Sequence, residues 1–272
     1  MNINKGNKLE FSFFKNILLS WGLTFLVINL SFISYLYTRK MAVIDLFWGP
    51  FHFVQVLSCL LIFGIFPTNK ASIFYCLVIF LWAARLTIYL SVRSRGKGED
   101  VRYLNLSKSW KGRLSTNVLF RVFYGQYAIL LLTSLTLSLT MAKPALLLQH
   151  SLSKFGIFVA IFGLIFESIA DYQLQRFKRS INGSKNNLMR KGLWSLCRHP
   201  NYFGEICFWW GVWLMAWGTQ YYIIGLVSPI VITYLLTRFS GVPMLEKRYE
   251  GVPEYLDYIR KTNAIIPWKK AQ

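Results

Sequence analysis

The sequence predicts an all-α polytopic membrane protein with about seven transmembrane helices, its N-terminus outside and its C-terminus in the cytoplasm. The composition is one reason: 54% of the 272 residues are hydrophobic and only 15% are charged, unlike a soluble domain. Long apolar stretches separated by short basic loops are the second reason. No internal repeat, low-complexity tract or soluble linker interrupts them, so we expect one membrane domain over residues 1–272.

Seven apolar stretches are long enough, at roughly 20 residues each, to cross a bilayer. They cover residues 17–37, 43–66, 71–92, 122–141, 155–174, 203–219 and 221–237. The last two meet at Gly218, Thr219 and Gln220, so we expect a tight helical hairpin there. The first stretch is too long for the apolar part of a signal peptide and lacks a small-residue cleavage site, so we expect it to be retained.

The basic residues orient the predicted bundle, because Lys and Arg accumulate in cytoplasmic loops. Most of the 31 Lys and Arg residues fall in one set of alternate loops, including residues 93–121 and 176–198 and the C-terminal tail. Despite the net charge of +20, this clustering in loops argues against a nucleic-acid-binding face. Lysine and asparagine richness favours a bacterial inner membrane; a eukaryotic chain of this kind would lie in the endoplasmic reticulum.

Cysteine and histidine usage predicts neither a metal site nor a disulfide framework. The four cysteines lie in or beside apolar stretches without metal-ligand spacing, and there are only three histidines.

Ionisable residues at membrane depth are costly and mark candidate functional sites. Six such residues in the predicted spans are candidates, and in the predicted orientation all six fall in the cytoplasmic half of the membrane. This shared depth predicts a polar cavity open to the cytoplasm. The alternative is that Arg85 pairs with Asp45 or Asp171 to hold helices together. The residues are Asp45, Arg85, Tyr89, Glu167, Asp171 and Glu205.

Residues 198–205 read Arg-His-Pro-Asn-Tyr-Phe-Gly-Glu and stand where a basic loop enters an apolar stretch. Pro200 suits a first helical turn, and a helix N-terminus offers unpaired N–H groups to an anion. This run predicts the mouth of a site for a phosphorylated cofactor, with Arg198, His199, Asn201 and Tyr202 as contacts. The alternative is an ordinary interfacial helix start.

On the fifth predicted helix, Glu167, Asp171, Gln175 and Lys178 recur at three- and four-residue steps and share a face. A dinucleotide could use this order, with polar groups at the carboxylates and phosphates at the ammonium. Alternatively, the cation at the helix C-terminus simply complements the macrodipole.

Two other segments could close over such a cofactor. The basic turn after the third stretch, with Arg95 and two glycines, could cover phosphates, although a dinucleotide-binding glycine fingerprint is absent. In the tail, Tyr255 and Tyr258 could cover the cofactor pocket. Alternatively, the two tyrosines are anchors at the membrane interface, a role that Trp268 would also suit.

Together, several segments of the chain resemble a family of bacterial membrane proteins of unknown function whose C-terminal domain is similar to steroid 5-alpha-reductase. The resemblance covers about residues 43–268. The segments that carry it are Val-Ile-Asp-Leu-Phe-Trp-Gly at 43–49, Gly-Lys-Gly-Glu-Asp-Val-Arg-Tyr at 96–103, Ala-Asp-Tyr-Gln at 170–173, residues 192–205 and residues 240–268.

The resemblance implies a seven-helix bundle that binds NADPH from the cytoplasmic side and delivers hydride to an electron-poor double bond of a lipid or steroid-like substrate. In the reductases a tyrosine that polarises the substrate carbonyl matches Trp82 here, and an indole is a poor proton donor. The candidate catalytic residues are Asp45, Trp82 and Glu205. The candidate cofactor contacts are Arg85, Tyr89, Arg95, Glu167, Asp171, Gln175, Lys178, Arg198, His199, Asn201, Tyr202, Arg238, Tyr255 and Tyr258.

Two other functions stay open. Isoprenylcysteine and phospholipid methyltransferases, which use S-adenosylmethionine, also carry an Arg-His-Pro-x-Tyr-x-Gly helix entry and a late Glu, matched here by residues 198–204 and Glu246. That second resemblance does not explain Asp45, the 96–103 loop or Asp171. A lipid-binding membrane protein without catalysis is the third possibility.

Overall fold

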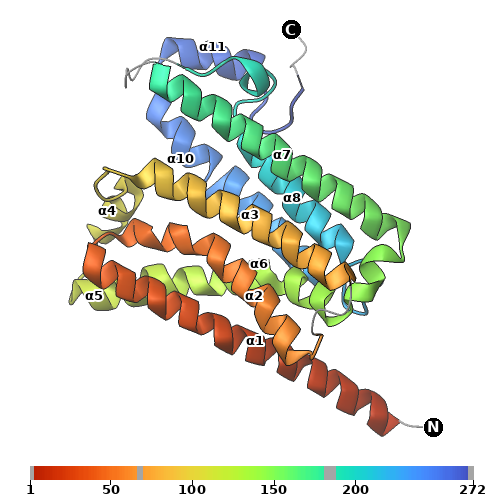
Figure 1. Cartoon of the computed structure of the whole chain (residues 1–272). Coiled ribbons are helices and arrows are strands. Elements are labelled where there is room, and N and C mark those ends of the chain that lie inside the picture. Colours follow the sequence, from red (N-terminus) through yellow and green to blue (C-terminus); the bar gives the residue numbers. More distant parts are fainter. Residues whose placement is uncertain (1–2, 66–69, 181–187, 269–272) are drawn as a thin grey trace. The chain divides into compact units, whose positions relative to one another are not determined.

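The computed structural model describes residues 3–65, 70–180 and 188–268, and the regular structure within these ranges is helical (Figure 1). The prediction of an all-helical membrane protein is confirmed. Within the described ranges, six helical runs are long and apolar enough to cross a membrane. They are Ser12–Thr38, Met41–Ile62, Lys70–Ser94, Leu114–Ala142, Ser151–Ser180 and Ile224–Glu246. The orientation of the termini stays a prediction.

The sixth predicted stretch, residues 203–219, differs from the other six. It forms helix α8 (Pro200–Met215), whose 16 residues span about 24 Å against a bilayer core of about 30 Å. The next α-helix, α9 (Val227–Tyr234), begins only after residues 216–226. The tight hairpin expected at residues 218–220 is therefore wrong, because successive turns and the short η5 (Ile224–Leu226) precede α9.

The chain divides into two compact units, which we describe separately. Unit 1 comprises Met1–Gln149 with Gly218–Gly225, and unit 2 comprises His150–Trp217 with Leu226–Gln272. That the whole chain forms one membrane domain stays a prediction.

In unit 1, α2 packs against α1, α3 and α6. Gly49 of α2 allows the close approach of α3, because a Cβ there would lie 2.5 Å from the Ala83 carbonyl oxygen. The elements are α1 (Ile3–Thr38), the 3₁₀ helix η1 (Met41–Phe47), α2 (Trp48–Ile62), α3 (Lys70–Ser94), α4 (Val101–Ser107), α5 (Leu114–Asn117), the π-helix η2 (Val118–Tyr124), α6 (Gly125–Ala142) and η3 (Pro144–Leu148).

In unit 2, α7 (Ser151–Ser180) and α8 pack antiparallel with their backbones in contact. A Cβ on Gly163 of α7 would lie 2.5 Å from Gly204 O of α8, and one on Gly211 would lie 2.7 Å from Gly156 O. Small residues at such a seam let helix backbones approach closely in a membrane. The helix pair places residues from two distant parts of the sequence side by side.

The remaining elements of unit 2 bring the C-terminal segment back to the start of α8. They are the 3₁₀ helix η4 (Gly192–Ser195), α9, the π-helix η6 (Leu235–Phe239), α10 (Val242–Glu246), η7 (Lys247–Tyr249) and α11 (Pro253–Lys261). At the end of η6, the Ser240 N–H donates to Leu235 O at 2.8 Å, a five-residue step. Gly241 follows, where any Cβ would meet the backbone of Leu236. The chain then continues into α10, which carries Glu246.

Candidate functional site

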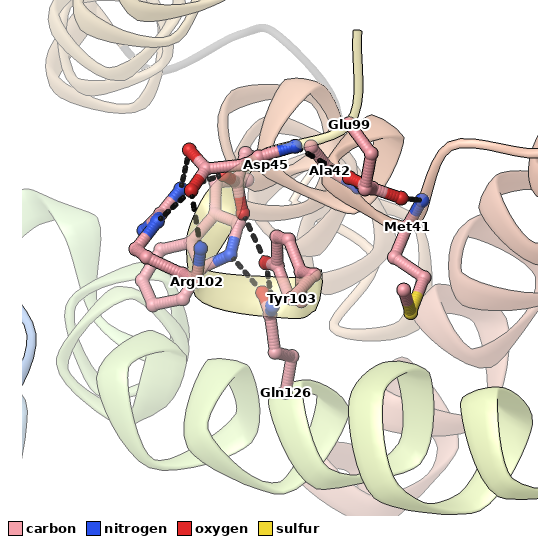
Figure 2. A network of polar contacts seen from close by, with 9 residues as sticks. Met41, Ala42, Asp45, Glu99, Arg102, Tyr103 and Gln126 are labelled. Carbon is pink, nitrogen blue, oxygen red and sulfur yellow. Dashed lines mark hydrogen bonds and ion pairs between the residues drawn. The ribbon is translucent and has the colours of Figure 1, made fainter. Parts of the chain in front are cut away.

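Unit 1 contains a polar network that joins η1 to α4 and α6, with Asp45 at its centre (Figure 2). Arg102 Nη2 donates to Asp45 Oδ2 at 2.7 Å, and the Tyr103 hydroxyl donates to Asp45 Oδ1 at 2.7 Å. Gln126 Nε2 donates to the Tyr103 oxygen at 2.7 Å, while Gln126 Oε1 accepts from Trp48 Nε1 at 2.6 Å. The indole can only donate and the carboxylate can only accept, so the hydrogen bonds run in one direction from Trp48 to Asp45.

In this network, the carboxylate of Asp45, a predicted catalytic residue, binds side chains of α4. Both carboxylate oxygens of Asp45 are engaged, one by an ion pair and one by a hydroxyl. Tyr103 is only 7% exposed, and burial together with the nearby Asp45 charge raises the pKa of the Tyr103 hydroxyl well above its ordinary value. Asp45 therefore orients a neutral tyrosine and an arginine.

Glu99 holds the basic loop after α3 against the start of η1. Its carboxylate accepts from the Met41 N–H and, at 3.1 Å, from the Ala42 N–H (Figure 2). On the same segment, Lys40 Nζ donates to Lys97 O at 2.6 Å. The loop that the sequence presents as a cover for phosphates is thus tied to η1.

The other candidates of unit 1 lie on or just after α3. The Arg85 guanidinium lies over the Tyr89 ring, 5.4 Å from its centroid, and both side chains are half-buried. Arg95 is exposed in the turn after the helix. Trp82 is fully buried, and its ring lies perpendicular to that of His52 at a centroid distance of 5.4 Å.

A buried polar seam in the core of unit 1 was missed by sequence reasoning. His52 Nε2 lies 2.9 Å from Thr133 Oγ1, and Gln55 Nε2 donates to Ser20 and Ser138 hydroxyls, each at 2.8 Å. His52 and Gln55 are fully buried three residues apart on one face of α2. That spacing was the available signal, and the contacts to α1 and α6 are interhelical hydrogen bonds of the kind that join membrane helices.

Unit 2 brings two predicted cofactor contacts from different helices together. Asn201, in the first turn of α8, donates from Nδ2 to Asp171 Oδ1 of α7 at 3.1 Å. Asp171 is 4% exposed, and Glu167, one turn earlier on the same face, is 6% exposed. Asn201 Oδ1 is also buried, and it accepts no hydrogen bond from the described residues.

The face of α7 that carries these carboxylates becomes more exposed toward the helix end. Glu167 and Asp171 are buried, Gln175 is half-buried and Lys178 is exposed. Along α7, side-chain exposure therefore increases in the predicted order from carboxylate to amide to ammonium.

Arg198, His199 and Glu246 form a second cluster in unit 2. Arg198 Nε donates to Glu246 Oε1 at 2.9 Å, and Arg198 Nη1 donates to Thr262 O. His199 Nε2 lies 3.0 Å from the same carboxylate oxygen and acts as the donor there, because a carboxylate only accepts. Arg198 is 8% exposed, so these contacts engage its guanidinium within the protein.

The tail is bound to this cluster through its backbone and its tyrosines. The N–H groups of residues 198 and 199 donate to the carbonyls of residues 263 and 264, each at 2.9 Å. Tyr258 donates to Trp194 O, and Tyr255 is 5% exposed. Burial raises the pKa of both tyrosines above the ordinary value. The two tyrosines of α11 therefore pack against the segment that precedes α8.

Three remaining candidates lie around the start of α8 and the end of η6. Glu205 accepts from Trp209 Nε1 at 2.9 Å, one turn along α8. The Tyr202 ring stacks on His199 with a centroid distance of 5.4 Å. Arg238 is exposed.

The six apolar helical runs and these buried polar clusters define an integral multi-pass membrane protein. The chain belongs to the family described as "Protein of unknown function (DUF1295)", which matches residues 31–262. Searches of curated proteins and of solved structures gave no match.

Proposed function

We propose that the protein is a membrane-embedded, NADPH-dependent reductase of an activated carbon–carbon double bond in a lipid or steroid-like substrate. The observation that carries this proposal is the buried Asn201 amide oxygen, held beside Asp171 where α7 meets α8. The predicted resemblance to steroid 5-alpha-reductases implies the same two residues as cofactor contacts.

The Asp171 carboxylate fixes the orientation of the Asn201 amide. Asn201 donates to Asp171 through its NH₂ group, so its amide oxygen points elsewhere. A buried carbonyl without a donor costs about 1–3 kcal/mol, and a ligand that supplies an N–H group would remove this penalty. The pair is therefore arranged to receive a hydrogen-bond donor.

NADPH fits this requirement through the primary carboxamide of its nicotinamide ring, and when bound it supplies the hydride. Arg198 is engaged by Glu246 and Thr262, so we assign the phosphates to exposed cations of unit 2. The residues of unit 2 that would hold the cofactor are Glu167, Asp171, Gln175 and Asn201 at its polar groups, with Lys178 and Arg238 at its phosphates.

Asp45 and Trp82 of unit 1 and Glu205 of unit 2 remain candidate catalytic residues. Asp45 would act as a positioning residue, because its two oxygens hold Arg102 and Tyr103. The Trp82 indole could donate a hydrogen bond to a substrate carbonyl but could not deliver a proton. Glu205 is oriented by the Trp209 indole.

We also propose that α8 crosses the membrane as a seventh span. It starts beside Asp171 and its end lies near Ser153, whose hydroxyl is 3.4 Å from Trp217 O. Those two α7 residues are about 27 Å apart along the helix, close to the bilayer core. The docking of residues 263 and 264 on residues 198 and 199 also requires the chain between them to return to its starting side.

An S-adenosylmethionine-dependent methyltransferase is the second candidate, and one observation favours it. Arg198, His199 and Glu246, which match the methyltransferase pattern, gather in one cluster of unit 2. These three residues bind one another and the tail, whereas Asn201 presents an acceptor without a partner among the described residues. We therefore place NADPH first.

The test compares the thermal stabilisation of the detergent-purified protein by NADPH and by S-adenosylmethionine, in the wild type and in Asn201→Ala. A ligand at 100 times its Kd stabilises the folded state by about 2.7 kcal/mol, which is easily detected. We expect NADPH to stabilise the wild type, and Asn201→Ala to lose most of this stabilisation. The matched control is Asn105→Ala, which removes an exposed amide of α4.

Two results would oppose the reductase. Stabilisation by S-adenosylmethionine alone would favour the methyltransferase. Stabilisation by neither compound would favour a non-catalytic lipid-binding protein, in which Asp171 and Asn201 tolerate substitution.

A further inference from the structure

We propose that the C-terminal segment, residues 253–268, lies in the headgroup region of an anionic membrane and inserts three apolar side chains into it. Leu256, Ile266 and Trp268 are 45%, 65% and 75% exposed. Asn263 Nδ2 donates to Trp268 O at 2.6 Å and closes the turn that presents the last two. Apolar surface left in water costs about 25 cal/mol per Å², so a lipid environment would stabilise this arrangement. The proposal does not depend on the cofactor.

The depth of this segment follows from the loop on which α11 packs, because Tyr258 donates to Trp194 O and that loop contacts α7. α7 has 30 residues and is about 45 Å long, which exceeds a bilayer core of about 30 Å. Its apolar part ends near residue 174, and basic residues follow at 176, 178 and 179. Trp194 Nε1 donates to Ala170 O, and the Leu193 N–H donates to Gln173 Oε1, each at 3.0 Å. The loop on which α11 packs therefore lies where hydrocarbon gives way to headgroups.

The sides of α11 differ in chemistry. Tyr255 and Tyr258 face the rest of unit 2 and are buried. Leu256 and Arg260, four residues apart, share one exposed flank. The two carboxylates lie on the other flank: Glu254 is exposed there, and Asp257 pairs with Lys261 at 3.0 Å and with Arg190 at 3.7 Å.

This asymmetry identifies an anionic lipid surface as the partner. An apolar side chain beside an arginine suits the boundary between acyl chains and anionic headgroups, where each nearby cation contributes about 1 kcal/mol. A tryptophan at the end of the segment suits the same boundary. The flank with Glu254 and the paired Asp257 would then face water.

The experiment places a nitroxide label at residue 256, 268 or 254 through Leu256→Cys, Trp268→Cys and Glu254→Cys. Cys76 and Cys207 are replaced by alanine, while Cys59 and Cys197 are buried. The proteins are reconstituted in phosphatidylcholine vesicles with and without phosphatidylglycerol. Collision rates with oxygen, which concentrates in lipid, are compared with those of a water-soluble nickel chelate.

We expect labels at 256 and 268 to favour oxygen and the label at 254 to favour the nickel chelate, with a larger contrast when phosphatidylglycerol is present. Equal nickel accessibility at all three positions would overturn the proposal. Spin–spin broadening at 268 in place of the oxygen preference would identify a second copy of the chain as the partner instead.

A second measurement needs no cysteine substitution. The emission of wild type minus Trp268→Phe isolates this one indole, and we expect quenching by lipids brominated near the headgroup. Emission of a water-exposed indole that these lipids do not quench would contradict membrane insertion.

Discussion

At the scale of single residues, the pair Asp171 and Asn201 carries the account, and exchanging the two groups tests it. In Asn201→Asp, two carboxylates would lie at hydrogen-bond distance and could not both ionise, so we expect a loss of about 1–3 kcal/mol in stability. The double variant Asp171→Asn with Asn201→Asp restores one amide and one carboxylate. Thermal unfolding should show that the double variant recovers stability. NADPH binding should not recover, because the amide oxygen is then carried by residue 171 on α7 and no longer by residue 201 on α8. Additive losses would argue against the pair.

Arg198 is expected to stabilise unit 2 by joining the tail to α8. Arg198 and His199 both bind the Glu246 carboxylate, so removing Arg198 takes away one of its partners, and a hydrogen bond to a charged group contributes about 1.5–3 kcal/mol. We therefore expect Arg198→Met to lower the melting temperature and to expose residues 253–268 to protease. Arg113→Met, at an exposed position, should change the melting temperature little. Equal behaviour of the two variants would show that the tail docks without Arg198.

The Tyr103 hydroxyl predicts a dependence on alkaline pH. Its folded pKa is raised by burial and by Asp45, so its contribution to stability is complete below the ordinary tyrosine pKa and is lost as pH rises above that value. At neutral pH, Tyr103→Phe should cost about 1–3 kcal/mol, because Asp45 and Gln126 each lose a hydrogen-bond partner. Between neutral pH and about pH 11, above the ordinary tyrosine pKa near 10, the wild type should lose more stability than the variant. Parallel slopes would contradict a raised pKa of the Tyr103 hydroxyl.

At the scale of helices, the glycine seam between α7 and α8 determines whether Asp171 and Asn201 meet. We expect Gly163→Ala to cost about 1–3 kcal/mol, because the added Cβ would meet the backbone of α8. Gly22→Ala is the control: Gly22 lies exposed on α1 with open space around its Cβ position, so alanine should stabilise the helix by about 1 kcal/mol. Thermal unfolding measures both. A Gly163→Ala variant as stable as wild type would mean that the helices can separate freely.

Helix periodicity predicted which residues share a face, but it could not predict which side chains would pair. The face of Glu167 and Asp171 followed from their four-residue spacing, whereas the contact with Asn201 depends on the antiparallel packing of α8 across Gly163 and Gly204. The polar seam at His52 was missed because a single histidine in an apolar stretch does not indicate its partners. Arg198 looked available to a phosphate, since its partner Glu246 lies 48 residues later.

At the scale of the whole molecule, apolar length predicted most of the membrane helices and gave their limits approximately. It placed α8 and α9 too close together, because a hydropathy pattern does not show that residues 216–226 form turns. The division into two units depends on the packing between helices, which composition does not encode.

The seventh span makes a prediction about topology. If α8 crosses the membrane with the other six runs, the N-terminus and the C-terminus lie on opposite sides. A reporter that fluoresces only in the cytoplasm should be active when fused to the C-terminus and inactive when fused to the N-terminus. Activity at both ends would mean an even number of spans.

The central claim is that unit 2 holds a nicotinamide cofactor, and calorimetric titration of the wild-type protein with NADPH and with S-adenosylmethionine tests it most directly. The account predicts saturable binding of NADPH alone, with the affinity reduced in Asn201→Ala and unchanged in Asn105→Ala. Binding of S-adenosylmethionine alone, or of neither compound, would contradict it.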